Sequence, residues 1–539
     1  MGNVKEVDAL IVGAGFAGLY MLHLLRDQLG LNAIAIEHAS GVGGTWYWNR
    51  YPGARCDIAS HEYSFSFSEE LQQEWSWSEK YAGQAEILEY LEYVATRFNL
   101  KPDISFNTKV QSAIFDEKSK RWLIKTEAGT DYSAQYFIPA VGTLSSANIP
   151  VIQGQKDFKG DVYITSRWPA KGVDFKGKRV GIIGTGATAI QAIPVIAEEC
   201  EQLIVFQRTA NYTSPLCNGP MTTENEQEIK ANYRQLREDE QNSFGGMPYM
   251  QQRESALTDS PEEREDHYQK RWEKGGFNIW LGSYQDILTD KGANKTVADF
   301  LRSKIRERVN NPNVAELLCP EEDQLFGIKR QPCETHYYEA FNRDNVTLVD
   351  IKSAPIQEIT AQGLRTSKNS YEFDILIYAT GFDAFTGSLF KMGITGRNGL
   401  SLQKYWADGP RTYLGLSVHG FPNMFTITGP QSPSVLFNMP LAIEMHCEWI
   451  AACIKHMDKQ SFLEAEVDLL HEDDWIEHTR EVADMTLFPQ AKSWYMGANI
   501  PGKPRVFMVY VAGGPAYKKL ITEVAEKSYK GFKFTGSRT

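Results

Sequence analysis

The chain has 539 residues, a formal net charge of −12 and 23% charged residues. It is too long for one hydrophobic core, so two or three domains are expected. The acidic balance without a basic tract excludes nucleic acid as an expected partner, and the lack of a long apolar run excludes a membrane span. Seven scattered cysteines and ten histidines show no metal-ligand or Cys-x-x-Cys spacing. We therefore expect no metal and a reduced, cytoplasmic setting.

The first predicted elements are a strand, a glycine turn and a helix near the N-terminus. An apolar strand at 9–12 is followed by a glycine turn at 13–18 and an apolar helix at 19–25, and a second strand at 33–36 ends in an acid. This order is the dinucleotide fingerprint: phosphates lie at the helix N-terminus, and the acid accepts hydrogen bonds from ribose hydroxyls. The residues expected to bind the first dinucleotide are Gly13, Gly15, Phe16, Gly18 and Glu37.

The rest of the first domain reads as a helix and several strands. Apolar residues recur at helical spacing over 84–98, strands are expected at 110–115 and 122–126, and an apolar strand at 136–142 ends at a glycine. The first part of this domain is expected to end near that glycine.

A second nucleotide-type unit follows. A strand at 180–183 runs into Gly184-Thr185-Gly186-Ala187-Thr188-Ala189 and a helix to about residue 197. The next strand, 203–206, ends in Gln207-Arg208-Thr209 rather than in an acid. A guanidinium binds a 2′-phosphate in a bidentate manner, whereas a carboxylate would repel it. The unit is therefore expected to prefer NADPH to NADH, unless Arg208 is merely a solvated strand-end residue.

The second half of the chain supplies an insertion and a return to the first domain. Residues 222–308 are polar, charged and helical in pattern, whereas strands resume at 348–367 and 371–378. Helices are expected at 436–453 and 473–485. The predicted fold is α/β, with two Rossmann-like domains, for FAD and NADP, and a helical insertion in the NADP domain. Its parts are 1–146 and 383–539 for the FAD domain, 147–216 and 325–382 for the NADP domain, and 217–324 for the insertion.

Two nucleotide units in one chain suggest a flavoprotein that takes hydride from NADPH. A disulfide reductase would need a close cysteine pair near the flavin, and Cys56 stands alone. The tract around it is Gly44-Thr45-Trp46-Tyr47-Trp48-Asn49-Arg50-Tyr51-Pro52-Gly53-Ala54-Arg55-Cys56-Asp57. It resembles the long fingerprint of type I Baeyer–Villiger monooxygenases: Gly-x-Trp, four residues, an aromatic residue, Pro-Gly, three residues and Asp.

The resemblance extends over nearly the whole chain, which looks like the phenylacetone and cyclohexanone monooxygenases of that family. Matching segments lie at 206–209, 327–330, 337–339, 379–383 and 494–503. The resemblance implies bound FAD and NADPH, with a ketone and dioxygen as substrates and an ester or lactone as product, formed through an anionic flavin peroxide. A monomer or weak homo-oligomer is expected.

The resemblance also assigns roles to individual residues. Arg330 matches the catalytic arginine that stabilises the peroxide and the oxyanion, and Asp57 matches the carboxylate beside it. The other expected cofactor-binding residues are Gly44, Thr45, Trp46, Tyr51, Gly184, Thr185, Gly186, Ala187, Thr188, Gln191, Arg208, Thr209, Lys329 and Trp494. The expected substrate pocket consists of Thr143, Leu144, Ser434, Val435 and Leu436.

One position departs from the family pattern. The shorter signature is Phe-x-Gly, three residues, His, three residues and Trp-Pro, and here Ile164 stands where the histidine belongs. The isoleucine side chain neither titrates nor forms hydrogen bonds, so an uncoupled NADPH oxidase stays open as an alternative hypothesis. A flavin N- or S-oxygenase and a non-catalytic dinucleotide-sensing protein are two further hypotheses.

Overall fold

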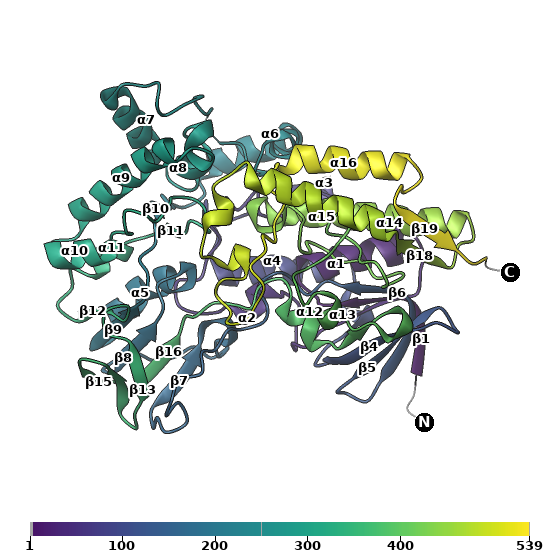
Figure 1. Ribbon diagram of the computed structural model, residues 1–539, viewed down its shortest axis with the longest axis horizontal. Coiled ribbons are helices and arrows are strands. Elements are labelled where there is room, and N and C mark those ends of the chain that lie inside the picture. Colours follow the sequence, from purple (N-terminus) through teal and green to yellow (C-terminus); the bar gives the residue numbers. More distant parts are fainter. Residues whose placement is uncertain (1–3, 250, 538–539) are drawn as a thin grey trace.

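The computed structural model describes residues 4–249 and 251–537. Two sheets built mainly from parallel strands lie side by side, and helices from the middle and the end of the chain lie along one side of them (Figure 1). This confirms the expected α/β class with two dinucleotide-type units and a helical insertion. The extreme ends of the expected domain ranges, 1–3 and 538–539, lie outside the described residues.

The first sheet has seven strands in the order β17-β4-β5-β6-β1-β2-β3. Strand β1 pairs in parallel with β2 and β6, which places Ile11 opposite both Ala35 and Ile138. The C-terminal halves of β1 and β6 (9–12 and 136–139) and all of β2 (33–36) are apolar, because both faces of the sheet are covered there. The short strand β17 pairs with β4, so the chain returns to this sheet after building the second one. The bounds are β1 Val4–Val12, β2 Ala33–Ile36, β3 Ile104–Ser105, β4 Val110–Asp116, β5 Arg121–Thr126, β6 Asp131–Pro139 and β17 Ile394–Thr395.

Helix α1 (Phe16–His23) begins immediately after the glycine turn and packs against α14 (Met439–Lys459) from the C-terminal part of the chain. Residues 24–28 continue α1 as a π-helical turn. The other elements of this half are α2 Thr45–Trp48, α3 Glu69–Glu74, α4 Gln84–Arg97, α12 Gly387–Lys391, α13 Leu402–Tyr405, α15 Leu469–Asp484, α16 Gly514–Glu526 and the strand pair β18 Glu464–Val467 with β19 Phe532–Thr535.

The second sheet has five parallel strands in the order β12-β9-β8-β16-β7. One face packs against α5 (Ala187–Glu199) and α11 (Tyr337–Ala340). The other packs against a small antiparallel sheet through a cluster that includes Phe206, Leu364 and Phe373. The bounds are β7 Asp161–Ile164, β8 Arg179–Ile183, β9 Gln202–Gln207, β12 Val346–Asp350 and β16 Ile375–Tyr378, with β13 Ile356–Ile359, β14 Gly363–Thr366 and β15 Ser370–Glu372 in the small sheet.

The expectation of one strand over 371–378 is wrong, because the chain changes sheets there. Strand β15 ends at Glu372 and β16 begins at Ile375. Between them Phe373 packs on Phe158, with ring centroids 5.6 Å apart. The next residue, Asp374, accepts hydrogen bonds from the backbone and the guanidinium of Arg179. These two anchors bend the chain from one sheet to the other.

Helices fill the segment between the strands of the second unit. They are α6 Thr223–Asn242, α7 Pro261–Lys274, α8 Asn278–Leu281, α9 Lys291–Arg308 and α10 Pro312–Leu318. Helix α7 starts with a capping box, in which the Ser260 side chain and Glu263 satisfy each other's backbone N–H groups. At the base of the segment, β10 (Ser214–Pro215) pairs with β11 (Cys333–Glu334), so the chain leaves and returns at one place.

A buried arginine fixes this helical segment to the first half of the molecule. Arg237 of α6 is 7% exposed and donates to Gln72, to Ser64 and to the backbone carbonyl of Phe65. It also pairs with Glu240 at 2.8 Å. Since each donor group of the guanidinium meets an acceptor, the charge is buried with compensation.

All seven cysteines are free thiols, and Cys217 alone among them is exposed. In the ranges 4–249 and 251–537, the helices are too short or too polar to cross a bilayer. The same ranges contain no group of three metal-ligating side chains placed to hold an ion.

Candidate active site

The first glycine turn is shaped for close approach of backbone. Gly13 has φ of +111°, and a Cβ there would lie 2.5 Å from the carbonyl oxygen of Ala140. A Cβ on Gly18 would lie 1.9 Å from the carbonyl oxygen of Gly13, so helix and strand pack without side chains. A Cβ on Gly15 would lie 3.3 Å from the Cα of Gly44, so the expected tract at 44–57 lies directly against this turn. The arrangement leaves the N-terminus of α1 bare, as a pyrophosphate requires.

Glu37 lies at the end of β2, as the fingerprint expects. Its carboxylate accepts from the backbone N–H groups of Ala14 at 2.8 Å and Ala39 at 2.7 Å. The acid is therefore oriented by the turn itself before any ribose is present. Two predicted aromatic residues point into the apolar core: Phe16 packs on Phe65 at 4.9 Å, and Trp46 is 7% exposed. Thr45 is exposed at the start of α2.

The second glycine turn has the same form with more open space. Gly184 has φ of +118°, and a Cβ there would lie 2.4 Å from the carbonyl oxygen of Ala379. A Cβ on Gly186, the N-cap of α5, would meet no atom within 4 Å. The Thr185 hydroxyl donates to the carbonyl of Thr209 at 3.0 Å and so holds the turn against the end of β9. Ala187 and Thr188 form the first turn of α5, whose N–H groups suit a phosphate.

Three cations, Arg208, Lys329 and Lys492, act on one another electrostatically near the end of β9. Arg208 and its neighbour Thr209 are exposed there, and Lys329 is half-buried. Burial lowers the pKa of Lys329, and the positive charges of Arg208 and Lys492 lower it further. Cations that destabilise one another in this way favour an anion among them, and a 2′-phosphate is such an anion. Lys492 was not among the predicted residues.

The two predicted catalytic side chains meet. The Nη2 of Arg330 lies 3.6 Å from the Oδ2 of Asp57, which is 8% exposed. The Nη1 of Arg330 donates to the carbonyl oxygen of Val435 at 3.5 Å, and the guanidinium lies 4.6 Å from the ring centroid of Phe277. The arginine thus contacts the fingerprint tract, the predicted substrate turn and the helical insertion. Its polar contacts are long, so its charge is available to a further group.

The environment of this pair shifts both ionisation equilibria. Burial raises the pKa of Asp57 to about 6, while the Arg330 charge, a backbone N–H from Cys333 and Gln191 pull it down. Burial lowers the pKa of Arg330, but the charge of Asp57, followed by Tyr495, more than offsets this and leaves the pKa above its usual value. The arginine therefore stays cationic, and the carboxyl titrates near the lower end of the physiological range.

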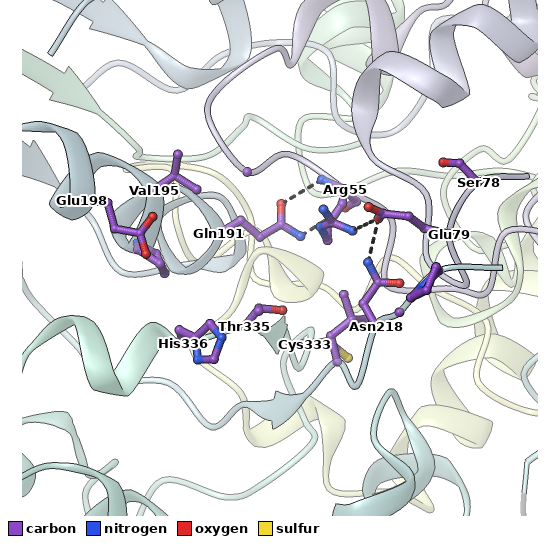
Figure 2. Close-up of a pocket in the computed structure, with 15 residues that line it drawn as sticks. Arg55, Ser78, Glu79, Gln191, Val195, Glu198, Asn218, Cys333, Thr335 and His336 are labelled. Atoms are coloured by element: carbon purple, nitrogen blue, oxygen red, sulfur yellow. Dashed lines mark hydrogen bonds and ion pairs between the residues drawn. The ribbon is translucent and has the colours of Figure 1, made fainter. Parts of the chain in front are cut away.

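Gln191 of α5 connects this pair to the second unit. Its side-chain N–H groups lie 3.4 Å from Asp57 and 3.1 Å from the carbonyl of Arg55, and its Oε1 accepts from the Tyr51 hydroxyl at 2.8 Å. Beyond Gln191 lies a cavity of about 610 Å³, which Cys333 also lines. Figure 2 shows the chain of contacts from Gln191 through Arg55 to Glu79 along one wall. Neither Asp57 nor Arg330 lines this cavity.

The predicted substrate residues come from two segments. Ser434, Val435 and Leu436 form one 3₁₀ turn, in which the Ser434 side chain is buried. Thr143 is buried, and its carbonyl accepts from the backbone of Phe385 at 2.9 Å. Leu144 is partly buried in the core of the first half. The ring of Trp494 lies 6.0 Å from that of Phe385, so Trp494 is close to the Thr143 segment.

Ile164 has a structural environment of its own. It ends β7, pairs with Tyr378 of β16 and packs against the apolar cluster of Phe206 and Phe373. An isoleucine is suited to this place, because it adds apolar area to a sheet face. Ile164, which replaces the histidine of the family signature, therefore packs within the apolar cluster of the second sheet.

Three residues of the site were missed by the sequence reasoning: Phe277, Lys492 and Tyr495. Phe277 lies in the helical insertion, far in sequence from any motif. Lys492 lies two positions before the motif residue Trp494, so proximity to that motif was its only signal, whereas Tyr495 lies within the matching segment 494–503 but was given no role there.

Two glycine turns, each following a parallel strand of its own sheet, and the pair of half-buried Arg330 with buried Asp57 define an oxidoreductase built to hold two dinucleotides. Residues 10–240 match the family model described as pyridine nucleotide-disulphide oxidoreductase. A Baeyer–Villiger monooxygenase of Pseudooceanicola batsensis is 44% identical over 98% of this chain and 97% of its own length.

Solved structures agree with these sequence matches. An oxidised steroid monooxygenase bound to NADP is 50% identical, with a TM-score of 0.94 over 98% of this chain and 99% of the other. A closed crystal structure of cyclohexanone monooxygenase is 41% identical, with a TM-score of 0.97 over 99% and 100%. The chain belongs to the Baeyer–Villiger monooxygenase family.

Proposed function

We propose that this protein uses FAD, NADPH and dioxygen to convert ketones into esters or lactones. The observation that carries the proposal is the pair of half-buried Arg330 and buried Asp57, 3.6 Å apart, where the fingerprint tract, the second unit and the predicted substrate turn meet. The family membership of the chain supports the reaction class. The choice of ketone, the domain ranges, the cytoplasmic location and the monomeric or weakly oligomeric state stay predictions.

The bare turn at Gly13, Gly15 and Gly18 fits FAD, with Glu37 already oriented for its ribose. When bound, FAD supplies hydride acceptance and the activation of dioxygen. The open turn at Gly186 fits NADPH, and Arg208, Thr209 and Lys329 would bind its 2′-phosphate.

The residues of this chain supply charge and position. Arg330 keeps a fixed positive charge where negative charge develops on oxygen during carbonyl addition. Asp57 holds that charge in place, and Gln191 orients Asp57 from the opposite side. Trp494 lies at the edge of the expected pocket, where it would exclude water from the reacting groups.

The test is a panel of ketones with NADPH, in which ester or lactone, consumed NADPH and released hydrogen peroxide are all measured. Wild-type protein should form ester with little peroxide release. Arg330→Ala should lower ester formation by about 100-fold or more, as loss of an oxyanion donor does. It should leave reduction of the flavin by NADPH unchanged. Arg306→Ala removes an exposed arginine paired with Glu316 and is the matched control.

The same measurements separate the competing functions. Peroxide release equal to NADPH consumption with every ketone would identify an uncoupled oxidase. Oxidation of amines or sulfides without ester formation would identify an N- or S-oxygenase. A protein that is not reduced by NADPH would be a dinucleotide sensor.

A further inference from the structure

The cavity beyond Gln191 is separate from the predicted cofactor and substrate sites. It has a volume of about 610 Å³ and lies where the fingerprint tract, helix α5 and the start of the helical insertion meet (Figure 2). Among the described residues that line it, Gln191 is the one that was predicted to bind a cofactor or the substrate. A volume of roughly 300–1,000 Å³ between structural units is typical of a small-molecule site. The cavity is therefore large enough for a ligand of its own.

The positive charge in the cavity wall is already paired. Arg55 is the one arginine or lysine among the lining residues within 4–249 and 251–537, and it donates to Glu79 at 2.6 Å and to the carbonyl of Tyr81 at 2.8 Å. Asn218 also donates to Glu79, at 2.7 Å (Figure 2). The remaining carboxylate, that of Glu198, is exposed. An anionic ligand would therefore find no free guanidinium or ammonium group here, and Glu198 would repel it.

Apolar side chains supply much of the remaining wall. Pro194 and Val195 lie away from the buried face of α5, and Leu216 and Pro220 come from the start of the insertion. The hydroxyl of Thr335 is exposed and has no hydrogen-bond partner in the part of the chain that the structure describes. Apolar surface with one free hydroxyl suits a neutral molecule that has an apolar body and a single hydrogen-bonding group. Ketones, esters and lactones have this character.

Two of the lining residues also hold the catalytic carboxylate. The side-chain N–H of Gln191 lies 3.4 Å from the Oδ1 of Asp57. The backbone N–H of Cys333 donates a hydrogen bond to the same carboxylate. The Oδ2 of Asp57 faces Arg330 at 3.6 Å. A ligand in the cavity would therefore contact residues that themselves contact Asp57.

We infer that this cavity is a second binding site for a neutral ketone, or for the ester or lactone made from it, apart from the position beside Arg330. The inference rests on the proposed function, which supplies this class of molecule, and deepens it by adding a site one residue away from Asp57. The bound molecule packs its apolar body against Val195 and Leu216. Its carbonyl oxygen accepts a hydrogen bond from the free hydroxyl of Thr335.

Benzophenone is a suitable probe, because it is itself a neutral ketone and forms covalent bonds to nearby C–H groups when it is irradiated. The FAD-loaded protein, without NADPH, is irradiated with increasing benzophenone, digested and analysed by mass spectrometry. A sample irradiated without benzophenone identifies damage caused by the flavin. We expect saturable labelling of peptides that carry residues 191–198 or 216–220, because these segments line the cavity.

Two variants fill the cavity from different walls. Val195→Trp enlarges a half-buried side chain of α5, and Thr335→Trp enlarges an exposed one, so thermal unfolding should show that at least one variant folds. Each folded variant should lower the labelling of 216–220 by about 10-fold or more, a loss of about 1.4 kcal/mol in binding free energy. The matched control is Leu257→Trp, at a leucine of the insertion that is 54% exposed and does not line the cavity. It should leave the labelling unchanged.

Three results would overturn the inference: no labelling of 191–198 or 216–220, labelling that does not saturate, or labelling of 216–220 that persists in a folded cavity-filling variant. Failure of the proposed function has a different signature. The wild-type protein would then form no ester from any ketone, whereas photolabelling needs no turnover and would still report on the cavity.

Discussion

Asp57 is a carboxyl group whose protonation state changes close to neutral pH. Its pKa is raised to about 6 by burial, against the pull of Arg330. As the pH falls through 6, Asp57 becomes neutral and no longer anchors Arg330, so ester formation should fall. The folded-state pKa lies above the unfolded one, so the contribution of this group to stability moves the opposite way and increases as the pH falls from about 6 towards about 4.

The measurement is kcat for ester formation between about pH 5 and 8, with flavin reduction followed separately. Asp57→Asn should be slower at the alkaline end and should lack the loss of activity near the pKa of Asp57, because the amide does not titrate. Asp323→Asn, at an exposed position outside the site, should retain the wild-type profile. An acid limb that persists in Asp57→Asn would assign the limb to another group.

The cations beside the second turn make a separate prediction at the same scale. Lys329→Ala and Lys492→Ala should each raise KM for NADPH by about 10-fold or more, the cost of one hydrogen bond to a charged group. The KM for NADH should stay the same, because NADH has no 2′-phosphate. Lys492→Arg keeps the charge and should resemble the wild type. Equal losses with both coenzymes would show that these lysines do not bind the 2′-phosphate.

At the level of elements, motif-bearing segments were the predictable ones. The strand at 33–36 was predicted to the residue, and the glycine turn and α5 were placed closely, because glycine geometry and apolar runs are local signals. Pairing of Arg330 with Asp57 came through the family resemblance rather than from local pattern. The split at Phe373 was not predictable, since it depends on contacts with Phe158 and Arg179 from distant strands.

Buried Arg237 carries the buried polar contacts that attach helix α6 to the first half of the molecule. Arg237→Ala should lower the free energy of unfolding by about 3–5 kcal/mol, because it leaves the buried carboxylate of Glu240 without its partner. Thermal unfolding at mildly alkaline pH measures this. Arg234→Ala, about one turn away on the same helix with a side chain that is 90% exposed, should cost under about 0.5 kcal/mol. A small effect of Arg237→Ala would mean that the helix is held by its other contacts, such as those of Lys230 and Gln241.

At the scale of the whole molecule, the Trp494 loop is tied to the connection by which the chain passes from the second sheet back to the first. Lys503 donates to Asp383 and to the carbonyl of Ala384, both at 2.7 Å, and Asn499 donates to the carbonyl of Phe382 at 2.7 Å. Figure 1 shows this region between the two sheets. The loop is therefore attached to the connection between the two sheets at three polar contacts.

Lys503→Ala should loosen the loop. Backbone hydrogen exchange at 493–503 should speed up by about 10-fold, since the lost ion pair and hydrogen bond stabilise the docked state by roughly 1.4 kcal/mol. Peroxide released per NADPH should increase, because water then reaches the reacting groups. Lys527→Ala removes an exposed lysine paired with Glu523 and serves as the control. Unchanged exchange in Lys503→Ala would show that the loop is held by its aromatic residues.

The single exposed thiol provides a labelling site for following movement of the helical insertion. Cys217 lies at the entrance to the helical insertion, next to the β10 strand, while the other six thiols are buried. A maleimide fluorophore would therefore label one defined point without any engineered cysteine. Burial raises the pKa of the Cys217 thiol while Lys80 acts against the shift, so labelling is best done at mildly alkaline pH. The dye would report, in real time, whether the insertion moves when coenzyme arrives.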